Sequence, residues 1–217
     1  MYNRCVRRDR GAKPSLTRCS QLRADAGRIV TNHDIGVGPL ELALFEVPAR
    51  PRGPENPRLM LAASTPNPGW IRQTVEITHA GRTYAVRTSR RKSVLGKLAG
   101  NIGLDAASIE VALHDPEQWL MSCSDRDLEL GDNAMLLGSE AIQFGGAAPL
   151  GGGRFRLTTL LRGRAGTEAV SHAAGEKLVL LDRTALEPVN LPVLVPGKPV
   201  RASALGGSAE CSLTLNS

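Results

Sequence analysis

Residues 134–161 read AMLLGSEAIQFGGAAPLGGGRFRLTTLL, and this stretch decides the fold class. Its second half alternates with a period of two: one face collects Phe155, Leu157 and Thr159, and the other collects Arg154, Arg156 and Thr158. In the first half, Ile142 and Phe144 share one face. We therefore expect a β-hairpin at the centre of the fold, with the Gly-rich residues 145–153 as its loop.

The same periodicity recurs along the chain, with turn signals about every ten residues. The predicted strands are 40–47, 59–63, 74–78, 83–88, 108–113, 134–137, 140–144, 154–161, 177–181, 200–205 and 211–215. Residues 93–98 could form a short helix, although Gly96 would weaken it. The pattern predicts a mainly β protein of antiparallel sandwich or barrel-like modules, with long Gly- and Pro-rich loops and little helix.

The net charge of +6 belongs to one end of the chain. Residues 1–30 hold eight basic and two acidic residues, so the remainder is neutral. We expect a disordered basic leader there, and nucleic-acid binding is disfavoured because no recognition motif follows. No apolar run reaches the roughly 20 residues that span a bilayer, and no secretory signal is visible.

No motif with catalytic or metal-binding spacing is found. Residues 145–153 lack the Gly-Lys-Ser/Thr of a phosphate loop, and His114-Asp115 is better explained as a turn at a strand end. The four cysteines are scattered, and no histidine lies at ligand spacing from any of them. The acidic residues of one further segment are expected to lie in a solvated loop rather than to bind Ca²⁺: Asp125, Asp127, Glu129 and Asp132. We expect no enzyme activity, no cofactor and no metal.

A long, ordered set of motifs carries a family resemblance. It comprises NAMLLGSEAIQF (133–144), PLGGGRFRL (149–157), LLRGRAGTE (160–168), His172 and GEKLVLLD (175–182). These segments resemble the C-terminal region of the large tail-tip, or baseplate hub, proteins of siphophage-like particles and gene transfer agents of alphaproteobacteria. Two positions depart from that family's pattern, Phe155 for Tyr and Leu178 for Phe.

The resemblance implies a structural component of a phage-like tail tip, located in the virion, with other tail proteins and a homo-oligomeric ring as partners. Family members are several times longer and carry upstream domains, including a TIM barrel that resembles glycoside hydrolases. The chain is thus expected to be a fragment of a larger hub protein. The expected parts are the leader 1–30, a tail-hub-like β domain 31–187 and a C-terminal β segment 188–217.

Five residues are candidates for interaction: Arg162, Arg164, Glu168, Trp70 and Trp119. Arg162 and Arg164 flank Gly163, which permits positive φ and lets the two guanidinium groups diverge. A planar guanidinium binds carboxylates through two hydrogen bonds, so we expect a clamp to Glu140, Glu168 or Glu176, either internal or to a neighbouring subunit. The other candidates are Trp70 and Trp119. Together with Tyr84 they define an alternative function, a carbohydrate-binding β-sandwich that adheres to host glycans.

Overall fold

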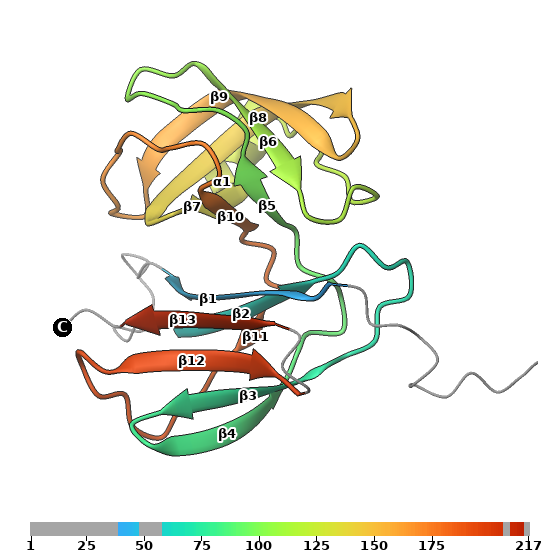
Figure 1. The fold of residues 1–217 in the computed structure, drawn as a ribbon. Helices are drawn as coiled ribbons and strands as arrows, with labels where there is room; N and C mark the ends of the chain where they lie inside the picture. The colour runs from blue at the N-terminus through green and yellow to red at the C-terminus, as the bar shows by residue number, and fades with distance from the viewer. Residues whose placement is uncertain (1–38, 48–57, 206–208, 215–217) are drawn as a thin grey trace, which may run out of the picture. The chain divides into compact units, whose positions relative to one another are not determined.

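The computed structural model describes residues 39–47, 58–205 and 209–214, all within the unit Val37–Ser217 (Figure 1). Within these ranges the chain forms thirteen strands and one short helix. The strands are antiparallel, which confirms the predicted mainly β class. The predicted basic leader 1–30 lies outside the described residues.

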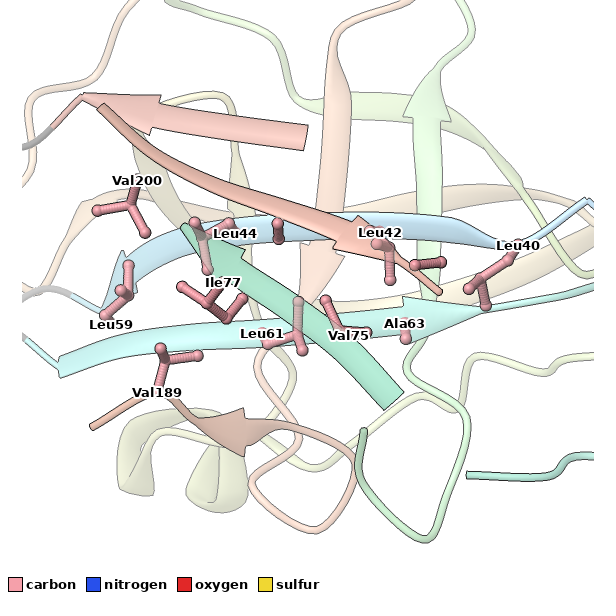
Figure 2. Packing of buried hydrophobic residues seen from close by; sticks show 12 residues of the cluster. Leu40, Leu42, Leu44, Leu59, Leu61, Ala63, Val75, Ile77, Val189 and Val200 are labelled. Atoms are coloured by element: carbon pink, nitrogen blue, oxygen red, sulfur yellow. The ribbon is translucent and has the colours of Figure 1, made fainter. Parts of the chain in front are cut away.

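Two sheets form a sandwich. One contains β1 (Glu41–Val47), β2 (Arg58–Ser64) and β11 (Glu187–Pro188), and the other contains β13 (Glu210–Thr214), β12 (Pro199–Ala204), β3 (Thr74–His79) and β4 (Arg82–Arg87). Figure 2 shows Leu42 and Leu61 of the first sheet pointing toward Val75 and Ile77 of the second. The C-terminal strands are part of this sandwich, because β12 pairs directly with β3.

Six strands close into a barrel in the order β10 (Lys177–Leu180), β5 (Leu95–Leu98), β6 (Ser108–Leu113), β9 (Arg154–Arg164), β8 (Glu140–Gly151) and β7 (Ala134–Leu137). A barrel of this size has an interior that side chains fill completely. Ile142, Phe144, Phe155 and Leu157 lie in this interior and are at most 1% exposed. The predicted inward faces of both hairpin strands at these four positions are confirmed.

The sheet β1–β2 is buried on both faces. Leu42 and Leu44 face the sandwich core, whereas Phe45 contacts a separate cluster with Leu136 and Val179 from the barrel wall. Strands that are covered on both sides read as continuous apolar runs rather than as alternating patterns. This explains why residues 40–47 and 59–63 are apolar nearly throughout.

The Gly-rich connection of the central hairpin is much shorter than predicted. Residues 145–153 were expected to form a loop, but β8 continues to Gly151, and Gly151 pairs with Arg154. The turn therefore consists of Gly152 and Gly153, with φ of 58° and 71°. A two-residue hairpin turn of this kind needs positive φ at both positions, which two glycines supply.

The strand β9 changes faces at Thr159. This residue was predicted on the core face with Phe155 and Leu157, but it is exposed and has a φ of 53°. Positive φ at a β-branched residue rotates the chain out of the regular pleat, so Leu160 rather than Thr159 packs against the barrel core. Arg162, two residues beyond Leu160, is thereby turned toward the barrel end.

Two other expectations were wrong. Residues 93–98 contain the strand β5 (Leu95–Leu98) rather than a helix. Gly96 has no side chain and lets the Ala112 carbonyl approach, since a Cβ there would lie 2.6 Å from that oxygen. The acidic segment forms the helix α1 (Asp125–Leu130) rather than a loop. Ser124 caps its first turn by accepting the Asp127 amide hydrogen, and Gly131 ends it at a φ of 104°.

Candidate functional site: a buried carboxylate cluster at the barrel end

Glu140 and Arg162 meet because they lie near the same end of two antiparallel neighbours, at the start of β8 and near the end of β9. Arg162 donates from Nε to Glu140 Oε1 over 2.7 Å and from Nη2 to Oε2 over 2.8 Å. The Glu140 side chain is fully buried and that of Arg162 is 11% exposed. This parallel pair of charge-assisted bonds is the geometry in which guanidinium and carboxylate bind most strongly.

The loop between β9 and β10 folds back over this pair. Its residue Val170 donates its amide hydrogen to Glu140 Oε2 and accepts from Arg162 Nη2 through its carbonyl. His172 lies with Nε2 2.9 Å from Glu140 Oε2 and Nδ1 2.9 Å from Glu176 Oε2. We call Glu140, Arg162, His172 and Glu176 the carboxylate cluster.

The pKa of Glu140 shows how strongly the cluster favours its charged form. Burial alone raises the pKa of Glu140, but hydrogen bonds from Arg162, His172 and the amides of Gly163 and Val170 outweigh it and lower the pKa from 4.5 to about 2. The same contact raises the pKa of Arg162. Both groups therefore stay charged in the folded protein across the neutral range.

The chemistry open to Glu140 is limited by these contacts. Five donors approach its two oxygens, and a carboxylate offers about four lone-pair positions. A general base needs a free lone pair and access to the proton that it removes, and Glu140 has neither. The carboxylate cluster is thus a structural clamp that holds the β9–β10 loop onto the start of β8.

Glu176 reaches the cluster over a glycine. Gly138, in the β7–β8 turn, has a φ of 55°, and a Cβ at this position would lie 1.9 Å from Glu176 Oε1. Any larger residue would displace the carboxylate that contacts His172. Gly138 is therefore required both by its backbone conformation and by the space it leaves.

The structure brings one of the five candidate residues into this site. Arg162 pairs with Glu140, one of the three carboxylates that the sequence left open. Arg164 instead donates to Gln143 Oε1 over 2.8 Å, and the Gln143 amide donates to the Leu128 and Asp132 carbonyls. Glu168 is exposed and forms no ion pair with any described residue.

The two tryptophans lie in different parts of the fold. Trp70 packs against the sandwich core and donates its indole hydrogen to the Ser89 carbonyl. Trp119 is 64% exposed and rests edge-to-face on Phe155, with ring centroids 5.2 Å apart. Tyr84 lies on the edge strand β4 and forms no ring pair with either tryptophan. The three aromatic rings are thus placed separately.

A second buried ion pair was not anticipated. Asp115 is nearly fully buried and binds Lys92, whose ammonium also donates to the carbonyls of Thr65 and Asn67. The neighbouring His114 contacts Glu41 and the Pro39 carbonyl, so His114 and Asp115 have separate partners. The two ion pairs leave no signature in local spacing because their partners are more than twenty residues apart.

The residues that the structure describes contain no group of three His, Cys, Asp or Glu side chains arranged to hold a metal ion. Cys123 and Cys211 are free thiols, and burial raises the pKa of Cys211 to about 11. None of the described helices is long and apolar enough to cross a membrane.

The fold and the site define a β-sandwich and a six-stranded barrel whose β9–β10 loop is fastened by a buried ionic clamp. Residues 89–179 match the family model described as Rcc01698-like, C-terminal. This match begins before β5, ends within β10, and contains all four residues of the carboxylate cluster. No curated protein matches the chain.

Proposed function

We propose that this chain is a structural and interaction component of a phage-like tail tip or baseplate, and that it corresponds to the C-terminal part of a larger hub protein. One observation carries the proposal. The motifs by which the sequence resembles tail-tip proteins contain Glu140, Arg162, His172 and Glu176, and these four residues assemble into one clamp. The same residues fall within the range of the family-model match.

The physical properties of the barrel suit such a role. A tail tip must keep its shape under mechanical load, and closed β-barrels resist shear through continuous cross-strand hydrogen bonds. The buried clamp fastens the long β9–β10 loop to the start of β8. The proposed partners are other tail proteins and further copies of this chain in a ring. The proposed location is the tail tip of the virion, and the proposed activity is assembly rather than catalysis.

A particle-incorporation experiment tests this function. The chain, tagged after Ser217, would be expressed with the tail proteins encoded next to its gene, and particles would be purified by density-gradient centrifugation. We expect the tag in the particle fraction, with immunogold label at one end of the tail. Glu140→Gln should reduce incorporation, whereas the exposed control Glu168→Gln should not. Complete particles without the chain would refute the proposal.

Trp119 supports a second candidate, binding of host glycans. Its indole is exposed and held in place by Phe155, as a sugar-stacking platform requires. Binding to a glycan array that is lost in Trp119→Ala and kept in Trp70→Phe would favour this function. An array without signal for the parent protein would remove it.

A further inference from the structure

His79, at the end of β3, is buried and contacts backbone groups with both ring nitrogens. Its Nε2 lies 2.9 Å from the Val195 amide nitrogen, and its Nδ1 lies 3.3 Å from the Pro199 carbonyl oxygen. A backbone amide can only donate, so Nε2 must accept. The ring proton must then reside on Nδ1, which donates to Pro199. The contacts thus select one neutral tautomer of His79.

The segment that His79 holds is the apolar connection between β11 and β12, residues 189–198, which we call the VNLP loop after its first four residues. Val189 is buried, and Leu191 packs against the sandwich core. Val193 and Leu194 are 59% and 37% exposed. Beyond them, the Val195 amide is fastened by His79, and the Val195 carbonyl accepts from the Lys198 amide. His79 is therefore the side-chain anchor of the second half of the loop.

We propose that His79 is an acid-sensitive latch for the VNLP loop. When Nε2 takes up a proton, it can no longer accept the hydrogen bond from the Val195 amide. Two hydrogen-bond donors, the Nε2–H and the Val195 N–H, then face each other. The half of the loop beyond Leu191 then loses its anchor and opens, while the sheet β12–β3–β4 keeps its ladder. Acidification supplies this proton, so the loop opens as the pH falls.

The surroundings of His79 offer a protonated ring no compensation. From β4, Arg82 is its direct cross-strand partner. Its partner on β12 is the apolar Val200, while Arg201 points to the opposite face of the sheet because side chains alternate along a strand. Arg82 is cationic, and none of the described carboxylates pairs with the His79 ring. This inference stands on the contacts of His79 and is independent of the proposed tail-tip function.

Hydrogen exchange of the full chain tests the latch. Peptides that cover the VNLP loop would be followed by mass spectrometry at pH 8 and pH 5, with rates corrected for intrinsic chemical exchange. The loss of one net hydrogen bond corresponds to about three- to tenfold more opening at pH 5. In His79→Gln, the side-chain oxygen accepts from Val195 at both pH values, so the difference should vanish. His114→Gln, a matched substitution away from the loop, should retain it.

Two results would overturn the proposal. One is an equal pH dependence of loop opening in the parent and in His79→Gln. The other comes from nitrogen-15 NMR of the imidazole at pH 8, where we expect the proton on Nδ1. A proton on Nε2 would contradict the latch geometry directly. The NMR measurement uses the unmodified protein and so decides the matter even if His79→Gln does not fold.

Discussion

Arg162 grips the buried carboxylate of Glu140 with two parallel hydrogen bonds, of 2.7 and 2.8 Å, at the end of the barrel. Simple strand alternation places only one of the two residues there. Glu140 shares the inward face of Ile142 and Phe144, but Arg162 reaches this face only because β9 switches sides at Thr159. The clamp is thus a consequence of an irregularity in the strand, and it can be tested from several directions.

Glu140→Gln should destabilise the fold by about 3–5 kcal/mol, because it leaves the Arg162 guanidinium buried without its counter-charge. Urea unfolding of the parent and the variant measures this loss. Glu168→Gln is the matched control, since Glu168 is exposed and unpaired among the described residues, and it should change stability by less than about 0.5 kcal/mol. Equal stability of the parent and Glu140→Gln would mean that the clamp is not formed in solution.

Acid should weaken the fold through the same residue. The pKa of Glu140 is about 2 in the folded chain against 4.5 as its ordinary value, so the unfolded state takes up the proton first. The charged form of Glu140 therefore contributes about 3 kcal/mol to the free energy of unfolding. This contribution is fully present above pH 4.5 and is lost as the pH falls toward 2. Unfolding free energies at pH 6, 4 and 2.5 measure it. The unfolding free energy should fall less steeply with decreasing pH in Glu140→Gln than in the parent. An identical pH dependence in both proteins would contradict the lowered pKa of Glu140.

Gly138→Ala should be more damaging than Gly152→Ala, although both glycines have a φ near 55–58°. Each alanine carries the backbone cost of a left-handed conformation, about 1–2 kcal/mol. At Gly152 a Cβ meets nothing within 4 Å, whereas at Gly138 it would strike the carboxylate of Glu176. We expect a difference of about 1–3 kcal/mol, from loss of the Glu176–His172 contact, in thermal or urea denaturation. Equal costs would show that Glu176 is not held over Gly138.

Phe155→Ala should cost about 3–5 kcal/mol, because it empties part of the barrel interior and removes the ring on which Trp119 rests. Arg154→Ala, on the exposed face of the same strand, should cost well under about 1 kcal/mol. Denaturant unfolding of the two variants compares the faces directly. The reverse order would mean that the arginine face is buried, for instance against a second subunit.

The strand faces and the short helix can be predicted from local sequence. Alternation places Phe155 and Leu157 inside and Arg154 and Arg156 outside, since the pleat allows only two directions. The helix α1 also had local signals that the acidic composition obscured, with Ser124 as the N-cap, Asp127 three residues later and Gly131 after the last turn. Short elements such as these depend on capping residues more than on periodicity.

Other features had no local signal. Gly96 looked like a weak point in a helix, but it serves the close approach of the Ala112 carbonyl from a neighbouring strand. Gly145 acts in the same way, because a Cβ there would lie 3.0 Å from the Thr159 Cβ. Contacts of this kind join residues on different strands, so the residue type at one position cannot reveal them.

The amino-acid sequence by itself determined the β class, the inward faces of the central hairpin and the choice of glycine for its turn, because these follow from residue conformations and from a period of two. Tertiary structure decided which of three carboxylates Arg162 binds. Ring closure of six strands brings the start of β8, the end of β9 and the His172 loop to one place, and the turn of the chain at Thr159 aims Arg162 toward it. A buried charge needs a partner within hydrogen-bond distance. The distances between Arg162 and the three carboxylates are set only when the barrel closes, so the local sequence does not reveal the partner.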